Sequence, residues 1–549
     1  MAQQIPFSFF GQGETLASLG SLTMTLTNIE LTNFDTSCEV TDEGGGTVTD
    51  TGICWSTNPN PTIADNFKSS GSGGVGPFTV DILDIDGLLN DTTYYFRAYA
   101  TNLYGQSYSN QVVQTTSYVP LITEWTTTIP FDSIELMRTN IFAVAVSIDA
   151  WVDWGDGSAI ENFVGTDASL LNNMSHTYDV AGTYEVKVSG EYPRPAMGSQ
   201  DELIEIKQWG TQIWKSLASC FDGANFMNCT ATDIPVFDVI ELNLRGGFTS
   251  MFRRTIGFGG PFVANPSFAS WNVSGIEEFD NMFRGTSFNQ DISSWNMSSA
   301  IDIGAMFAFC PSFNQDISGW NVSNVTSFST LFRQAISFNQ NLDSWDVSSG
   351  NLFISTFQGS NVTLSTLSSW DMTSATNVSK MYQSALHIHS GISSWDMSNI
   401  TSIASMFNSS TGVIPDITGW TTSSFEIIGG AFANTNFNQN ISVWDTSSVT
   451  GIGTMFQNNT AINQNFGSWD ITNVIAGGFF RFMDNVTTLS TANYDALLIS
   501  WEAQGPVSNI STIYFGTTQY TKAPSPAATA HNSLLTTYNW TIIDGGPTP

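Results

Sequence analysis

The sequence is poor in basic residues and in charge altogether. Only 15 of its 549 residues are Lys or Arg, against 48 Asp or Glu, and the formal net charge is −33. Binding to DNA, RNA or an anionic membrane surface depends on basic side chains that pair with phosphates, so this composition argues against all three partners. Charged residues make up 11% of the chain, against about 25% in an average soluble protein. Ser, Thr, Asn and Gly therefore supply most of the surface polarity.

Signals for export, membrane insertion and catalysis are also scarce. The first twenty residues have neither the basic segment nor the apolar run of a secretory signal peptide, and no stretch approaches the ~18 apolar residues of a transmembrane helix. The chain has no Gly-x-Ser-x-Gly, no His-Glu-x-x-His and no phosphate-binding loop motif, and it contains only four His. We assign no catalytic, cofactor-binding or metal-binding residue. A glycan-cleaving carboxylate pair is the enzymatic alternative.

The five cysteines leave two interpretations open. They form no CxxC motif and no Cys/His cluster, which disfavours a structural zinc site. Cys38 could pair with Cys54, and Cys220 with Cys229, leaving Cys310 over. Buried free thiols fit the same positions equally well.

What the sequence does contain is a repeat. Trp recurs every 24 or 25 residues, at Trp271, Trp295, Trp320, Trp345, Trp370, Trp395, Trp420, Trp444 and Trp469. Pairs such as Met282-Phe283 and Met306-Phe307 keep the same step, and so does the motif Phe-Asn-Gln-Asp/Asn-Ile/Leu at 288–292, 313–317, 338–342 and 437–441. A unit this short cannot bury its apolar face alone. Stacked copies can, so the repeat predicts a solenoid in which each Trp lies over the previous one.

The repeated polar and aromatic positions each have a functional and a structural interpretation. The Trp series would suit a sugar-stacking surface, but we favour a core stripe because it recurs in phase with other apolar residues. The column of Asn289, Asn314 and Asn339 predicts a hydrogen-bonding ladder inside turns. His387 and His389 interrupt the pattern and could hold a metal, but no third ligand is evident.

The text FNQDISGWNVSNVTSFSTLF (313–332) and its copies resemble the BspA-like family of bacterial leucine-rich-repeat surface proteins. The segment LIEIKQWGTQIWKSLASCFDGA (203–224) resembles the start of such an array, and LSTANYDALLISWEAQG (489–505) resembles its closing segment. Thr356-Phe357 and Ala431-Phe432 depart from the usual Met-Phe pair. The resemblance implies a leucine-rich-repeat-like solenoid with an extracellular adhesion or recognition role, not an enzyme.

Two β modules precede the array. The motifs VDWGDG (152–157), HTY (176–178) and AGTYEV (181–186) resemble a polycystic-kidney-disease (PKD) domain, which is a β-sandwich. Asp153 and Asp156 could bind calcium, although turn-capping is the simpler role. Earlier, Phe96 and Ala98 alternate with Tyr95, Arg97 and Tyr99 in strand fashion, and this block resembles fibronectin-type-III-like modules.

These observations predict a mainly β, multidomain chain: two immunoglobulin-like β-sandwiches followed by a leucine-rich-repeat-like solenoid and a C-terminal cap. The expected ranges are an attachment segment at 1–24, a fibronectin-like sandwich at 25–117, a PKD-like sandwich at 118–200, the solenoid at 201–486 and the cap at 487–549. The expected function is non-enzymatic recognition or adhesion at an exposed surface, with glycans or host surface proteins as ligands.

The opening of the sequence favours a virion over a cell surface. Because no export signal is visible, we expect a phage fibre or capsid decoration protein, with a bacterial cell-surface or secreted adhesin as the alternative. The apolar patch Ile5, Pro6, Phe7, Phe9 and Phe10 would then dock on a capsid or tail protein. A first strand packed on the protein's own sandwich is the other reading of this patch.

Overall fold

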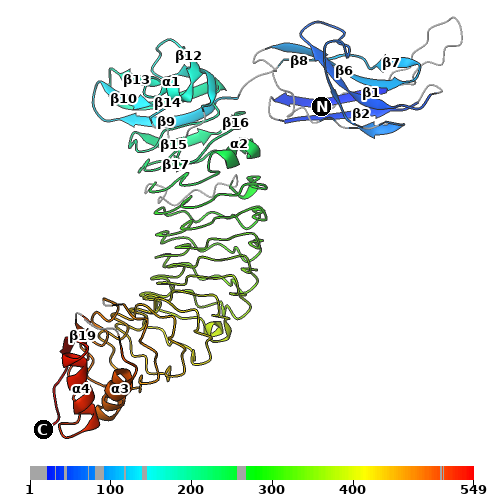
Figure 1. Ribbon diagram of the computed structural model, residues 1–549. Coiled ribbons are helices and arrows are strands. Elements are labelled where there is room, and N and C mark those ends of the chain that lie inside the picture. The colour runs from blue at the N-terminus through cyan, green and yellow to red at the C-terminus, as the bar shows by residue number, and fades with distance from the viewer. Residues whose placement is uncertain are drawn as a thin grey trace, which may run out of the picture.

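The computed structural model describes residues 22–30, 33–42, 46–71, 73–78, 80, 92–115, 119–138, 145–255, 268–475, 477–506, 510 and 512–549. The predicted docking residues Ile5, Pro6, Phe7, Phe9 and Phe10 lie outside these ranges. The described chain is mainly β with a few short helices, distributed over several separate sheets, as predicted (Figure 1). Within these ranges no helix is both long and apolar enough to cross a bilayer.

The N-terminal part contains two antiparallel sheets around a core of their own. One sheet has the order β1 (Leu22–Glu30), β2 (Asn33–Val40), β5 (Gly76–Phe78). The other joins β4 (Asn66–Ser69), β3 (Asp50–Ser56), β6 (Thr93–Asn102) and β7 (Gly105–Tyr108), with β8 (Val112–Thr115) also on β6. Phe96 and Ala98 point into this core, which fits the strand alternation read from the sequence.

A second antiparallel layer follows and continues directly into the solenoid. Its elements are β9 (Leu121–Thr127), β10 (Asp132–Glu135), β11 (Ser147–Asp153), β12 (Glu161–Thr166), α1 (Asp167–Leu170), β13 (Ser175–Tyr178) and β14 (Gly182–Glu191). The main sheet runs β12-β11-β14-β9 and then adds β15 (Leu203–Gln208) and β17 (Asn228–Cys229). β15 pairs antiparallel with β9 and parallel with β17.

This strand β15 changes the sheet from antiparallel pairing to the parallel pairing of the coils. The predicted boundary at residue 200 falls inside the resulting sheet. One hydrophobic core runs without a break from Leu121 to Trp540. The antiparallel layer therefore covers the first edge of the solenoid, which would otherwise present unpaired backbone groups.

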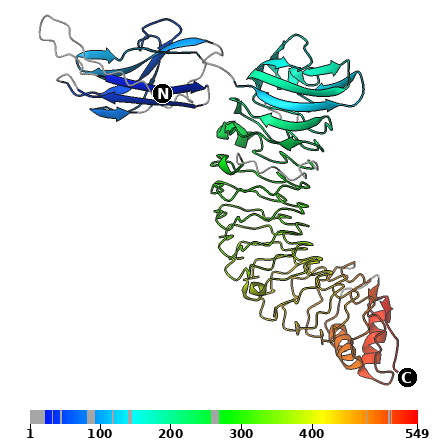
Figure 2. The same cartoon turned by 180° about the vertical axis from the view of Figure 1, so that it is seen from behind.

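The solenoid coils are nearly free of regular strands. They follow β16 (Ile213–Trp214), β18 (Val236–Phe237) and α2 (Val239–Leu244). Among the described residues between α2 and residue 490, the named elements are the 3₁₀ turns Phe268–Ser270 and Ser390–Ser394. Successive coils meet at single parallel bridges along the series Glu278, Asp302, Ser327, Leu352, Asn377, Ser402, Ile427 and Gly451. The coils stack into a bent rod (Figure 2).

Backbone hydrogen bonds between coils run both ways. The amide of Thr326 donates to the carbonyl of Ile301 in the previous coil, whereas the amides nearer the Met-Phe pairs donate to the next coil. The amide of Asn281 donates to the carbonyl of Gly304 at 2.8 Å, and the amide of Ala305 donates to Ser329 at 2.8 Å. Asn281, Ala305 and Thr330 have φ values of 56°, 53° and 58°. This left-handed conformation costs an L-residue energy. Here it occurs at residues whose amides donate to the next coil.

The nine repeat tryptophans form the core. Each is at most 5% exposed, and several neighbouring indoles stack, with ring centroids 6.5 Å apart for Trp320 and Trp345. The indole Nε1–H of Trp345 donates to the carbonyl of Ile317 at 3.0 Å, and most other members of the column repeat this bond. Phe307 and Phe332 stack in a parallel column at 6.1 Å.

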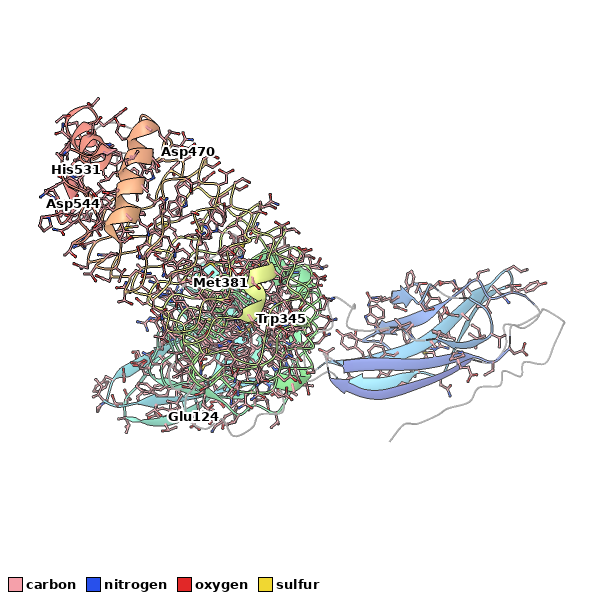
Figure 3. All side chains as sticks on the ribbon, turned by 90° about the horizontal axis from the view of Figure 1, so that it is seen from below. Glu124, Trp345, Met381, Asp470, His531 and Asp544 are labelled. Atoms are coloured by element: carbon pink, nitrogen blue, oxygen red, sulfur yellow. The ribbon has the colours of Figure 1, made fainter. Side chains whose placement is uncertain are left out.

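Two helices cover the far end of the rod. They are α3 (Thr491–Ala503) and α4 (Pro526–Thr536), accompanied by the parallel pair β19 (Ile513–Tyr514) and β20 (Ile542–Ile543). Trp501 of α3 donates its Nε1–H to the carbonyl of Phe466 at 3.0 Å and so extends the tryptophan pattern into the cap. His531 of α4 lies close to Asp544, which follows β20 (Figure 3), with Nε2 and Oδ2 3.1 Å apart.

Candidate ligand-binding groove on the solenoid

One set of surface positions is nearly the same in every coil and serves the turns. Asp291 and Asp316 each accept the amide two residues ahead at 2.9 Å, and these bonds lower the pKa of both carboxyls. The side chain of Asn314 accepts the amide of Asn339 at 2.9 Å, and Asn289 accepts that of Asn314 at the same distance. The predicted asparagine ladder is thus present. These polar groups are occupied by their own backbone.

A second set of positions, on the face that carries the bridges, changes from coil to coil. The residues at the bridge begin with Glu278 and Asp302 and become neutral in later coils, ending with Ile427 and Gly451. The position directly after the Phe of each Met-Phe pair changes in the same direction: Arg253, Arg284, Ala308, Arg333, Gln358, Gln383, Asn408, Ala433 and Gln457. The aromatic core beneath is nearly constant, whereas this face differs from coil to coil.

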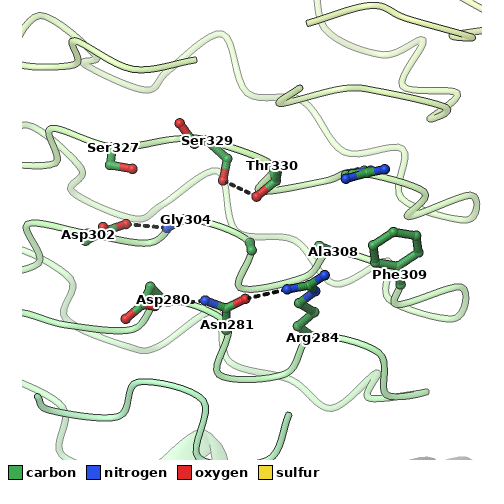
Figure 4. A pocket seen from close by; sticks show the side chains of 12 residues that line it. Asp280, Asn281, Arg284, Asp302, Gly304, Ala308, Phe309, Ser327, Ser329 and Thr330 are labelled. Carbon is green, nitrogen blue, oxygen red and sulfur yellow. Dashed lines mark hydrogen bonds between the residues drawn. The ribbon is translucent and has the colours of Figure 1, made fainter. Parts of the chain in front are cut away.

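A groove of about 320 Å³ lies on this face (Figure 4). Three successive coils line it, through Asp280, Asn281, Arg284, Asp302, Gly304, Ala305, Ala308, Phe309, Ser327, Ser329, Thr330 and Arg333. Ala308 stands where the coils on either side carry Arg284 and Arg333, and its small side chain leaves the space open. Figure 4 shows Asp280 and Asp302 toward one end and Arg284 with Phe309 toward the other.

The carboxylate end is crowded with like charge. Asp302 accepts the amide of Gly304 at 2.6 Å, and Asp280 accepts the amide of the Asn281 side chain at 2.8 Å. Burial raises the pKa of Asp302, and the charge of Asp280 adds to this effect. Burial also raises the pKa of Glu278, with further contributions from Asp302 and Asp280. A ligand that donates hydrogen bonds to these carboxylates would reduce the repulsion between their charges.

The other end holds two guanidinium groups on either side of one aromatic ring. The Cζ atoms of Arg284 and Arg333 lie 5.7 and 5.1 Å from the ring centroid of Phe309, which is 38% exposed. Arg284 donates to the side-chain oxygen of Asn281 at 3.2 Å, and the Nε of Arg333 is buried without a hydrogen-bond partner. In contrast, Arg253 and Arg254 both pair with Asp222.

Within the described ranges, Arg284 and Arg333 make no ion pair with a carboxylate. Burial lowers the pKa of Arg284, and the nearby charges of Arg253, Arg333 and Arg254 lower it further. The charges of the two groove arginines are therefore balanced by an aromatic ring and an amide, not by an acid.

The aspartates considered for calcium act as turn caps. Asp153 accepts the amide of Gly155 at 3.0 Å, and Asp156 accepts that of Ser158 at 2.9 Å. Asp156 also lies 2.8 Å from Nε2 of His176. Burial opposes ionisation of Asp156, but the bonds from Ser158 and His176 outweigh it and lower the pKa to about 2. Over the residues placed by the structure, no three His, Cys, Asp or Glu side chains gather as ligands for a metal ion.

The two histidines of the repeat differ in exposure, because His389 is buried and His387 is only partly buried. His389 is 1% exposed, and its Nδ1 lies 2.9 Å from the hydroxyl of Tyr382. Burial, followed by the charge of His387, lowers the pKa of His389 to about 3.

All five cysteines are buried free thiols, so neither considered disulfide is formed. Burial raises the pKa of Cys54 to about 12 and that of Cys310 to about 11.

The groove residues were not singled out from the sequence, although a signal for them exists there. When the coils are aligned on their Met-Phe or Leu-Phe pairs, Arg253, Arg284 and Arg333 fall at one repeat position. Three of only 15 basic residues at one position is a concentration that the repeat register alone reveals. The interrupting Ala308 and the neighbouring Phe309 have no such signature.

The stacked coils, constant core and variable face define a repeat-solenoid protein. The family model described as "Mycoplasma protein of unknown function, DUF285" matches residues 247–365, 351–436 and 414–523. Together these matches span half of the chain, and the protein belongs to this family. BspA-like repeat proteins share this match, whereas the two β modules before residue 247 lie outside it. No curated protein and no solved structure matched the chain.

Proposed function

We propose that this protein is a non-enzymatic recognition protein that binds ligands on the variable face of its solenoid. The observation that carries the proposal is the contrast between a repeated aromatic core and a face whose chemistry changes with every coil. A purely architectural rod would gain nothing from this variety. Glycans and cell-surface proteins are the proposed ligands, because the groove offers carboxylates, hydroxyls, guanidiniums and an aromatic edge.

A glycan-cleaving enzyme is the less favoured use of the same groove. Hydrolysis needs two carboxylates free to act as acid and as base or nucleophile. Asp280 and Asp302 instead accept hydrogen bonds from Asn281 and Gly304 within their own coils. These bonds favour a binding role for both side chains.

The proposal includes an exposed location, on a virion or on a bacterial cell surface. In the virion version the chain is a fibre or decoration protein attached through its N-terminal segment. The second β layer and the cap close the two ends of the solenoid core, which would let the rod stand exposed without offering free edges.

A glycan array combined with pull-down of bacterial envelope fractions tests the proposal. The groove variant is Ala308→Gln, which fills the gap between the two arginines, and its matched control is Ala433→Gln at the same repeat position in a later coil. Recognition predicts binding by the wild type and the control and at least a tenfold loss in the groove variant, without hydrolysis of any bound glycan.

Two results would contradict this function. Release of reducing ends from a polysaccharide would indicate an enzyme. Absence of binding to every glycan and envelope fraction, with incorporation into particles, would indicate a purely structural coat component.

A further inference from the structure

In the part of the chain that the structure describes, Arg284 and Arg333 have no carboxylate partner, although the protein is strongly acidic. The chain carries a net charge of −33 and only 15 basic residues, and several other arginines do form ion pairs. Arg194 pairs with Asp167, Arg245 with Glu241, and Arg253 with Asp222. The two groove arginines have no such partner among the described residues, although Asp280 and Asp302 line the same groove.

The structure holds these two guanidiniums in place. They sit on coils that are two repeats apart, and the ring of Phe309 between them lies 5.7 and 5.1 Å from their Cζ atoms. The Nε of Arg333 is buried and donates to nothing, which leaves a hydrogen-bond donor unsatisfied where water is largely excluded. An anionic acceptor that enters the groove would accept a hydrogen bond from this Nε–H and would balance the charges of both guanidinium groups.

We propose that the groove binds an acidic sugar, with the carboxylate or sulfate group between Arg284 and Arg333. Guanidinium groups recognise such anions through paired charge-assisted hydrogen bonds. At the opposite end Asp280 and Asp302 accept hydrogen bonds from sugar hydroxyls, and the buried, unpartnered hydroxyl of Ser329 adds a further polar contact. This inference rests on the proposed recognition function and names its ligand class.

The dimensions and charge of the site favour a sugar over other anions. The volume of about 320 Å³ is at the lower end of the ~300–1,000 Å³ typical of small-ligand sites, so it suits a single residue or the end of a chain. A nucleic acid would bring a continuous line of phosphates against a strongly acidic protein. A sugar brings one anion together with several hydroxyl donors, and the groove offers two cations next to two carboxylates.

Isothermal titration calorimetry with four probes tests the inference. The probes are tetragalacturonate, the same oligomer with its carboxylates reduced to alcohols, sulfated tetragalactose and tetraglutamate. We compare wild type with Arg284→Gln, Arg333→Gln and the double variant.

The control variant is Arg481→Gln. Arg481 also lies over an exposed ring, 5.8 Å from the centroid of Phe480, but it is paired with Asp484 at 3.0 Å. Thermal melts of each variant confirm folding, and Arg333→Lys tests whether charge without the planar fork is sufficient.

The expected result is binding of at least one acidic oligomer by the wild type and by Arg481→Gln. Each groove substitution weakens the Kd about tenfold, which corresponds to about 1.4 kcal/mol. Arg333→Lys retains part of the affinity. The carboxyl-reduced oligomer binds at least tenfold more weakly than tetragalacturonate. The arm that binds, uronate or sulfate, identifies the anion.

Three outcomes overturn the inference. They are equal affinity of the acidic and reduced oligomers, equal affinity of wild type and double variant, and arginine-dependent binding of tetraglutamate that matches the sugar. In each case the recognition function is judged separately by the array, where another ligand could still be found. Failure of the array together with failure of all four probes removes both proposals.

Discussion

Acid should weaken this protein at one buried histidine. His389 is buried against Tyr382 and Phe357, and its pKa is lowered from about 6.5 to about 3. Below pH 6.5 the imidazole of His389 is protonated in the unfolded chain but stays neutral in the folded protein. The free energy of unfolding therefore falls as pH falls, by about 1.4 kcal/mol per pH unit until the folded pKa is reached. Between pH 6.5 and pH 4.5 this amounts to about 3 kcal/mol.

The assay is urea unfolding of the full chain between pH 7.5 and pH 4.5, followed by tryptophan fluorescence. The variant His389→Phe replaces the imidazole with an apolar ring that cannot be protonated. Phenyl rings pack in the same way within the core of other coils, where Phe313 lies 3.8 Å from Phe307. We expect this variant to lose about 3 kcal/mol less than the wild type over the same range. His387→Gln, which leaves the buried ring in place, should keep most of the pH dependence.

This window avoids the aspartates of the Asx turns. Their lowered pKa values mean that their contribution is present above their unfolded pKa and is lost only as pH falls through the still lower folded value. Parallel losses in wild type and His389→Phe would refute the reasoning, because the buried imidazole would then not be the group that resists protonation.

Three further predictions concern the core. Trp345→Phe should cost about 1–2 kcal/mol more than Trp444→Phe in equilibrium unfolding, since the indole of Trp345 bonds the carbonyl of Ile317 whereas that of Trp444 has no partner. Arg194→Met should destabilise the protein by about 3–5 kcal/mol, because it leaves the carboxylate of Asp167 buried and unpaired; loss of less than 1 kcal/mol in a thermal or urea melt would contradict this. The five cysteines should be inert to a thiol reagent at pH 8 in the native protein and should all react in denaturant, a result checked by counting released chromophore.

Part of the acidity of the protein comes from the repeat. Many of its aspartates stand at turn positions such as Asp291, Asp316 and Asp346, where each carboxylate accepts backbone or hydroxyl hydrogen bonds from the residues just after it. Duplication of one coil multiplies that charge. The face that carries the groove departs from this pattern, because Arg284 and Arg333 lie there without a carboxylate partner among the described residues.

The solenoid and its aromatic core can be predicted from the repeat pattern. A Trp every 24 or 25 residues, in phase with a Phe column, leaves stacking as the means to bury both, and Trp320 and Trp345 lie where that argument puts them. The asparagine ladder of Asn289, Asn314 and Asn339 could be predicted in the same way. The spacing of residues along the chain specifies these features, and the stacked structure agrees with that prediction.

The junction of the antiparallel layer with the coils, and the position of the groove, depend on contacts between segments that are far apart in sequence. β15 pairs with β9 on one side and β17 on the other, a choice that no local pattern encodes. The groove likewise exists because Ala308 lies between Arg284 and Arg333, which are 49 positions apart in sequence and become neighbours of one ring when the coils stack. Repetition determines which residues are buried, whereas the stacking of unlike coils determines which exposed residues meet.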